Sequence, residues 1–219
     1  MIEIEQQRGL RSTVFVIPFR EDPGLDPNGT PSPRARAALY DASCLAPLLR
    51  AIEKQGWEIG VHGLKGHLSS QSARSEREAI ESLGVKVWGH RSHWLITSPL
   101  LYWNLIEAGY AYDSSTRVSD GCKGRDVVHV ADRCLVVLPI AVQDKDVLAN
   151  QNMEIAWSEI KKRLDKARAE EDTVTVLVHT NHFGPPRFWG DLYERMLDYA
   201  LGQGAAICRA IDAVQDANT

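Results

Sequence analysis

The sequence predicts an α/β protein whose mainly parallel sheet is covered by helices. Short β-rich runs alternate with helical segments along the whole chain. The helical segments also carry start and stop signals, such as Ser98-Pro99 at one beginning and Gly109 at its end. No repeat or linker divides the sequence, so we expect a single domain over residues 1–219. An open doubly wound sheet and a closed or nearly closed barrel both satisfy this pattern.

Strands are expected where β-branched and other apolar residues cluster. The predicted strands cover residues 11–17, 57–62, 85–88, 134–142, 173–178 and 205–209. The segment 20–36 is rich in proline, glycine and charge, and we interpret it as a loop. The polar segment 110–133 is interpreted as irregular.

Helices are expected where apolar residues recur with a helical period. The predicted helices cover residues 44–55, 75–83, 98–109, 152–170 and 191–201. Residues 2–8 resemble the end of a further helix, which Gly9 stops. Since a helix in a β/α protein normally follows a strand, either the domain begins with this helix or a strand precedes it.

The composition and charge of the sequence argue against several classes of partner. Lys and Arg number 25 against 29 Asp and Glu, a net charge of -4, so nothing favours a nucleic-acid partner. The apolar runs are strand-sized, which argues against a membrane span. The polar start MIEIEQQRG resembles no signal peptide and predicts a cytoplasmic protein.

The four cysteines form no C-x-x-C pair, so we expect reduced and mostly buried thiols. The oligomeric state is not indicated.

Histidines gather after the predicted strands. Six of the seven occur in such positions: His62, His67, His90, His93, His179 and His182. Because the carboxyl ends of parallel strands meet at one edge of a sheet, we expect these rings at a common rim. Imidazoles there suit a divalent metal or acid/base catalysis. His62 and His67 bracket a glycine-containing turn and could share one ion, although His62 could also belong to a structural hydrogen-bond network.

Three other residue types support a reactive rim. Arg91 needs an anionic partner, so it either orients a catalytic carboxylate or forms a structural salt bridge with Asp113 or Asp144. Asp144 follows a strand, and it is either an orienting carboxylate or a solvated loop residue. Trp94 offers a face for stacking on a sugar or, alternatively, packs in the core.

Several segments in order resemble the polysaccharide deacetylases, the NodB-homology domain of carbohydrate esterase family four. The matching segments are GLRSTVFV (9–16), GWEIGVHG (56–63), GHRSHW (89–94), AGYAYDSS (108–115), LP (138–139) and VLVH (176–179). They span most of the chain. The I-G-V-H-G and R-x-H-W forms are closer to a divergent bacterial branch than to chitin deacetylases.

This resemblance implies a distorted or incomplete (β/α) barrel of the polysaccharide deacetylase type, with its first strand missing. It also implies a metal-dependent hydrolase that removes N-acetyl groups from a carbohydrate. The cofactor would be a divalent metal, expected to be zinc, with nickel and cobalt as alternatives.

The resemblance further implies a role for each matching residue. His62 and His67 would bind the metal, Arg91 would orient the catalytic base, and His179 would be the general acid. Asp144 is grouped with these catalytic residues as an orienting carboxylate. The residues expected to contact the substrate are Trp94, Leu177, His182 and His93; Leu177 would line the pocket for the acetyl methyl group.

The sequence departs from the family in three ways. The family's opening strand ends in two aspartates, a general base and a metal ligand, and no such pair occurs before residue 11. Four residues rather than three separate His62 from His67, and His93 replaces a usual proline. We therefore expect that the sequence begins after that strand. The alternatives are a noncatalytic carbohydrate-binding protein and a site rebuilt with other carboxylates, such as Glu21 and Asp22.

A β/α-barrel glycosidase is the alternative from another enzyme class. It would need two carboxylates facing each other across the site, roughly 5–10 Å apart. Carboxylates are scarce at the predicted strand ends while histidines are abundant, which counts against a glycosidase.

Overall fold

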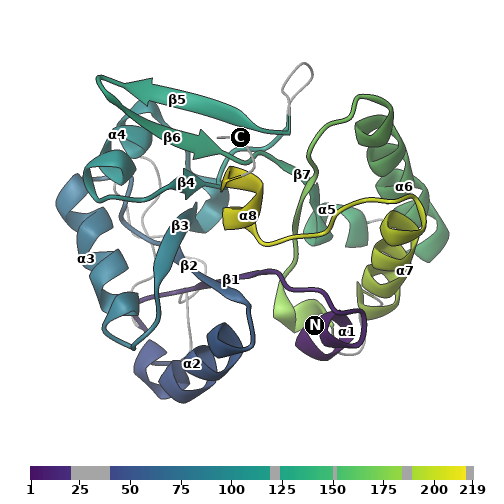
Figure 1. Ribbon diagram of the computed structural model, residues 1–219, viewed down its shortest axis with the longest axis horizontal. Coiled ribbons are helices and arrows are strands. Elements are labelled where there is room, and N and C mark those ends of the chain that lie inside the picture. Colours follow the sequence, from purple (N-terminus) through teal and green to yellow (C-terminus); the bar gives the residue numbers. More distant parts are fainter. Residues whose placement is uncertain (21–39, 119–123, 150–151, 184–188, 216–219) are drawn as a thin grey trace. The chain divides into compact units, whose positions relative to one another are not determined.

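The computed structural model describes residues 1–20, 40–118, 124–149, 152–183 and 189–215. Its contacts divide the chain into two compact units. Unit 1 comprises residues 1–11, 117–125 and 139–208, and unit 2 comprises residues 12–116, 126–138 and 209–219 (Figure 1). The expected single domain over 1–219 stays a prediction.

Unit 2 is built on a six-stranded sheet. In spatial order its strands are β1 (Thr13–Val16), β2 (Glu58–Gly63), β3 (Val87–Ser92), β4 (Tyr112–Asp113), β6 (Arg133–Val137) and β5 (Asp126–Val130). The strands from β1 to β6 run parallel, and β5 pairs antiparallel with β6 at one edge. This mostly parallel sheet confirms the predicted α/β class.

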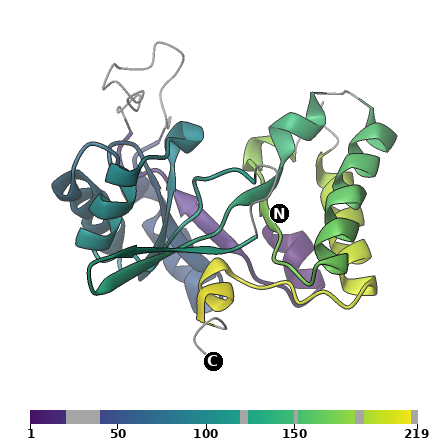
Figure 2. The same cartoon turned by 90° about the horizontal axis from the view of Figure 1, so that it is seen from above.

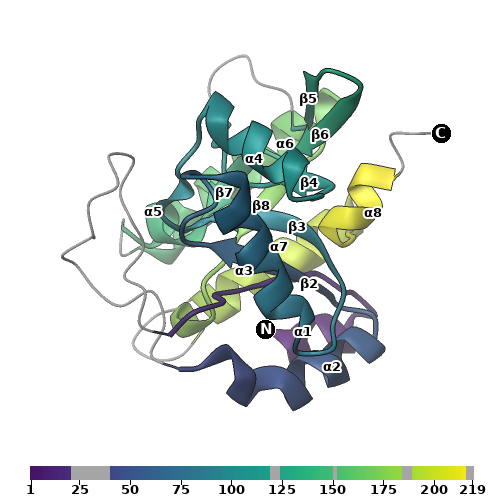
Figure 3. The same ribbon diagram turned by 90° about the vertical axis from the view of Figure 1, so that its left-hand side faces the viewer.

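Helices cover both faces of this sheet. On one face lie α2 (Ala46–Lys54), α3 (Ser70–Glu81) and α4 (Pro99–Glu107), and on the other lies the short α8 (Ala210–Gln215) (Figure 2). Seen from the side of the longer helices, α3 and α4 lie in front of the sheet (Figure 3). The Ser98 hydroxyl accepts a hydrogen bond from the Leu101 amide at 3.0 Å, which caps α4 as its sequence predicts.

Alternation along β2 decides which side chains meet which helices. Ile59 and Val61 are fully buried, on the face that α2 and α3 cover. Glu58 points to the α8 face, where its carboxylate accepts from the Ile211 amide. His62 has the same parity as Glu58 and is the register partner of Arg91 in β3, so both residues point to the α8 face.

Unit 1 packs helices against a two-stranded parallel sheet. Its elements are α1 (Ile2–Gln7), β7 (Ile140–Gln143), α5 (Asp144–Leu148), α6 (Met153–Ala169), β8 (Thr175–Leu177) and α7 (Trp189–Gly202). Its core centres on Val142, Ile160 and Trp189, all fully buried. The predicted N-terminal helix is confirmed, and the Tyr193 hydroxyl in α7 donates to Glu5 of α1 at 2.6 Å.

Three predicted segments are wrong. The strand expected over 134–142 is two strands, β6 and β7, which belong to different sheets. Pro139 lies between them and has no N–H to extend either ladder. The segment 110–133, expected to be irregular, contains β4 and β5. The last expected strand, 205–209, has no regular structure, and α8 follows it.

The other expected elements are confirmed with shifted ends. β3 continues to Ser92 rather than ending at residue 88, and α3 begins at Ser70 rather than at residue 75. The loop expected over 20–36 lies, apart from Arg20, outside the described residues. The expectation of mostly buried thiols is wrong, because Cys44, Cys134 and Cys208 are exposed.

The described strands form no closed barrel, in agreement with the expected incomplete one. No helix in the described ranges combines the length and the apolar character needed to cross a bilayer.

Candidate active site

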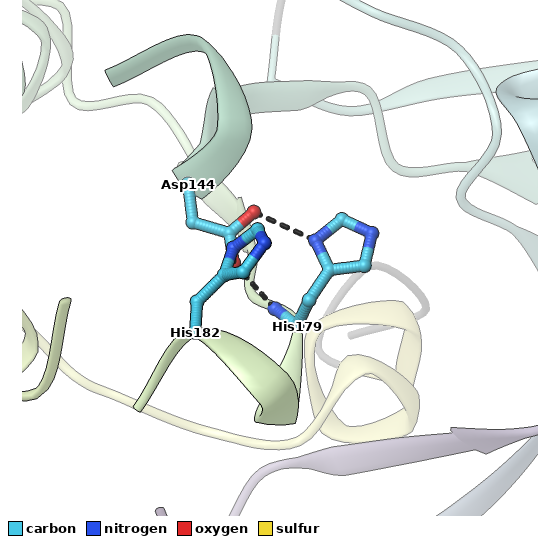
Figure 4. A group of neighbouring side chains, drawn as sticks. All are labelled: Asp144, His179 and His182. Atoms are coloured by element: carbon cyan, nitrogen blue, oxygen red, sulfur yellow. Dashed lines mark hydrogen bonds and ion pairs between the residues drawn. The ribbon is translucent and has the colours of Figure 1, made fainter. Parts of the chain in front are cut away.

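In unit 1, two histidines share one carboxylate (Figure 4). Asp144 follows β7 and His179 follows β8, and since these strands are parallel neighbours their carboxyl ends bring both residues together. The Nδ1 atom of His179 lies 2.7 Å from Oδ1 of Asp144, and Nδ1 of His182 lies 2.7 Å from Oδ2. The backbone amide of His179 also donates to Oδ2, at 2.6 Å. Both residues follow predicted strands, and the structure places Asp144 as an orienting carboxylate rather than a solvated loop residue.

The environment of Asp144 favours its charged form. Its side chain is fully buried, and burial alone would raise the pKa of the carboxyl. Hydrogen bonds from the side chain and backbone of His179 outweigh burial, so the pKa of Asp144 is lowered from its usual value. The ionised carboxylate accepts the Nδ1 proton of His179, which directs Nε2 of that ring away from Asp144.

The three residues differ in access. The His179 side chain is 34% exposed, whereas that of His182 is 3% exposed. His179 can therefore exchange a proton with a ligand, while His182 supports Asp144 from behind. Their donor atoms lie within 4.8 Å of one another, and one carboxylate with two imidazoles is also a set that catalytic zinc uses.

In unit 2, the ring of His93 contacts those of both His62 and Trp94 near the carboxyl ends of β2 and β3. Nε2 of His62 lies 3.1 Å from Nδ1 of His93. The rings of His93 and Trp94 pack edge to face, with 5.1 Å between their centres. Trp94 is 50% exposed. Its φ is 61° and that of Leu95 is 54°, two consecutive left-handed conformations that are unfavourable for such residues. The fold therefore holds an exposed indole in a strained position.

Arg91 lies beside His62 in the sheet and is buried. Its Nε donates to the Ser114 carbonyl at 2.9 Å and its Nη2 to the Ser114 hydroxyl at 2.8 Å. Its guanidinium lies 4.3 Å from the centre of the Phe15 ring. Burial lowers the pKa of Arg91 to about 10.

Neither salt-bridge partner considered for Arg91 takes that role. Asp113 instead pairs with His90 at 2.9 Å, and both side chains are fully buried. The oxygens of Asp144 bind His179 and His182. Across the described ranges, Arg91 forms no ion pair with a carboxylate.

Comparison with solved structures identifies the fold. The chain is similar to a putative polysaccharide deacetylase from Mycobacterium smegmatis, with a TM-score of 0.73 and 18% identity, over 98% of this chain and 74% of that one. The protein has the polysaccharide deacetylase fold. It is also similar to a 4-alpha-glucanotransferase from Thermococcus litoralis, with a TM-score of 0.50 and 17% identity, over 70% of this chain and 27% of that one. No family model matches the sequence, and no curated protein matches it.

The deacetylase fold agrees with the resemblance of the sequence segments, and the residue roles stay predictions. His67 is 7% exposed, and Glu76 fixes the turn before it by accepting hydrogen bonds from the Leu64 and Lys65 amides, both at 2.7 Å. In the described part of the chain His62 and His67 do not join a group of three metal-ligating side chains. Leu177 is 4% exposed within β8.

Sequence reasoning missed two buried networks on this deacetylase fold. Asp113 binds His90 and also the amide and hydroxyl of Ser115, which fixes the ends of β3 and β4. Glu58 accepts from the Tyr112 hydroxyl at 2.8 Å and from the Thr13 hydroxyl at 2.6 Å. The available signal was a charged residue inside an otherwise apolar strand, which requires a buried partner.

Proposed function

We propose that the protein is a metal-dependent hydrolase that removes N-acetyl groups from a carbohydrate. The polysaccharide deacetylase fold supports the reaction class. The observation that carries the proposal is the Asp144–His179 pair, because a partly exposed imidazole held by a buried carboxylate is a typical general acid/base arrangement.

Amide hydrolysis needs a proton at the departing nitrogen. Water adds to the acetyl carbonyl carbon, the C–N bond breaks, and the amine leaves only after it is protonated. His179 supplies this proton from Nε2. Asp144 keeps the Nδ1 proton in place and stabilises the imidazolium before the transfer. The products are acetate and the free amino sugar.

The metal, expected to be zinc, would polarise the acetyl carbonyl and acidify a water molecule. We assign it to His62 and His67, as the resemblance implies. The Asp144, His179 and His182 group also fits a zinc ion by its donor set. Four N–H groups already donate to the Asp144 oxygens, however, so an ion there would replace some of those hydrogen bonds.

Substrate contacts complete the proposal. The exposed face of Trp94 suits stacking on a sugar ring, and His93 adds a polar edge beside it. Leu177 is assigned to the acetyl methyl group. His182, also expected to contact the substrate, acts through Asp144 in this arrangement.

Acetate release from an N-acetylated oligosaccharide in the presence of zinc tests the proposal. His179→Ala should abolish release, whereas His129→Ala should retain it, because His129 is exposed on the edge strand β5. Release that persists in His179→Ala would refute the assignment of the acid, and no release from the zinc-loaded protein would refute the activity.

A noncatalytic carbohydrate-binding protein is the second candidate function. The observation that favours it is the exposed indole of Trp94, which suits stacking on a sugar ring whether or not a reaction follows. Saturable oligosaccharide binding without acetate release would support this alternative. A glycosidase is disfavoured because both oxygens of Asp144 are engaged by histidines.

A further inference from the structure

Two partly exposed histidines of unit 2 share a hydrogen bond between their rings. Nε2 of His62 lies 3.1 Å from Nδ1 of His93, and the two rings are nearly perpendicular, with 87° between their planes. Such a hydrogen bond needs a proton on one of the two nitrogens and a lone pair on the other. The contact therefore links the tautomer of one ring to the tautomer of its neighbour.

The direction of this hydrogen bond decides both tautomers. If Nε2 of His62 donates, both neutral rings carry their proton on Nε2, which is the tautomer that a neutral imidazole side chain favours in water. If Nδ1 of His93 donates instead, both rings must take the less favoured Nδ1–H form. Donation from His62 to His93 is therefore the lower-energy arrangement.

The fold holds His93 where it can accept this proton. The Ser92 amide donates to Oγ of Ser115 at 2.8 Å, and both serines are buried, which fixes the backbone directly before His93. Gly63 of β2 is the register partner of Ser92 in β3, so the paired strands bring the two rings together. The ring of His93 also packs against that of Trp94. An acceptor that is already held in place orients its donor with little further loss of side-chain entropy.

We propose that His93 is a positioning residue for His62. It fixes the Nε2–H tautomer of His62 and the orientation of that ring, so the lone pair of His62 lies on Nδ1. The inference rests on the proposed function in that it concerns a histidine assigned to the metal. A hydrogen bond at the second nitrogen orients a ligating imidazole and makes it more basic. His93 then carries its own proton on Nε2, and through that nitrogen it can only donate to a substrate.

The tautomer of His62 can be measured in the metal-free protein. Protein labelled with 15N in its histidines is studied at about pH 8, where ordinary imidazoles are neutral, by long-range 1H–15N correlation. We expect His62 in the Nε2–H form. We also expect a scalar coupling between Nε2 of His62 and Nδ1 of His93 across the hydrogen bond. Comparison with His62→Gln assigns the resonances.

Two variants of His93 separate the effect of the acceptor from that of the ring. His93→Phe keeps a ring beside His62 and Trp94 but has no acceptor, so His62 should populate both tautomers. His93→Asn places a carbonyl oxygen near the position of Nδ1 and should restore the Nε2–H form. His129→Phe is the matched control and should leave the signals of His62 unchanged, because His129 is exposed on β5.

Three results would overturn the inference: His62 in the Nδ1–H form, an unchanged tautomer in His93→Phe, or the same loss in His93→Asn as in His93→Phe. If a variant does not fold, the wild-type tautomer and coupling still decide the question. The measurement needs neither metal nor turnover, so it can succeed while zinc binding or acetate release fails.

Zinc affinity gives a second readout. If zinc binds His62, His93→Phe should weaken its affinity by about 10- to 100-fold, and His93→Asn should recover most of the loss. Unchanged zinc affinity in His93→Phe, together with a changed tautomer, would contradict the assignment of zinc to His62 and still support the role of His93 as the acceptor.

Discussion

At the scale of single residues, the arrangement around Asp144 explains why one carboxylate serves two imidazoles. His179 is accessible enough to meet a ligand, while His182 is buried and saturates the second oxygen. Without His182, the second oxygen would accept only the His179 amide, and the buried carboxylate would lose one of its hydrogen bonds, which costs stability. His182 is therefore a positioning residue that acts through Asp144.

Asp144→Asn should lower the rate of acetate release by about 10²- to 10⁴-fold, because an amide does not hold His179 in the required protonation form. Asp146→Asn is the control, since Asp146 lies two residues after Asp144 but forms an exposed ion pair with Arg117. A kcat that survives in Asp144→Asn would contradict the role of the pair.

The same substitution should change how the free energy of unfolding depends on pH. The pKa of Asp144 is lowered in the folded protein, so its ionised form contributes stability above the usual carboxyl pKa of about 4. That contribution is lost as the pH falls through the lowered pKa. In Asp144→Asn, the free energy of unfolding should be lower at neutral pH and should decline less steeply in acid. Urea denaturation between pH 2 and 7 measures both effects.

At the scale of elements, strand ends were more predictable than strand partners. Asp144 and His179 were found because a local rule, polar residues after an apolar run, places them at neighbouring strand ends. Glu58 was missed because its partner Ile211 is 153 residues away in the sequence. The break between β6 and β7 was missed because apolar residues continue through Pro139.

The Glu58 network should anchor α8 to the sheet. Glu58→Leu removes the acceptor of the Ile211 amide and of the Thr13 and Tyr112 hydroxyls. Buried donors without acceptors should lower the free energy of unfolding by on the order of 1–3 kcal/mol. Hydrogen exchange of the α8 amides should accelerate.

Glu58→Gln is the control for that experiment, since it keeps a carbonyl acceptor and should leave α8 protected. Burial raises the pKa of Glu58, so the folded state binds a proton more readily than the unfolded state. Wild-type stability should therefore fall as the pH rises from the usual carboxyl pKa through the raised value, and this fall should be absent in Glu58→Gln. Slow α8 exchange in Glu58→Leu would contradict the anchoring role.

At the scale of the whole molecule, two compact units form from interleaved segments of the chain. In unit 1, the buried side chain of Leu10 belongs to the same core cluster as Trp157 and Trp189. In unit 2, Tyr112 and Ile211 belong to one core cluster. No sequence boundary marks this division, because each unit takes residues from three separate stretches. The sequence predicts one domain because it contains no linker, which is the signal that sequence reasoning uses to separate domains.

Because the chain forms two units, the place where zinc slows amide exchange should show which donor set binds the metal. The two candidate donor sets lie in different units, His62 and His67 in unit 2 and the Asp144 group in unit 1. Zinc at about 100 times its dissociation constant should add about 2.7 kcal/mol to the free energy of unfolding. Under the proposed assignment, amide exchange should slow in the turn after β2, and His62→Ala should abolish the stabilisation.

His182→Ala separates the two sets, because it removes one imidazole from the Asp144 group and leaves unit 2 unchanged. It should retain zinc stabilisation while it lowers the acetate-release rate through the loss of support for Asp144. Zinc protection confined to the amides around β7 and β8, lost in His182→Ala but not in His62→Ala, would move the metal to unit 1. His179 would then be a ligand, and proton donation to the amine would fall to another group.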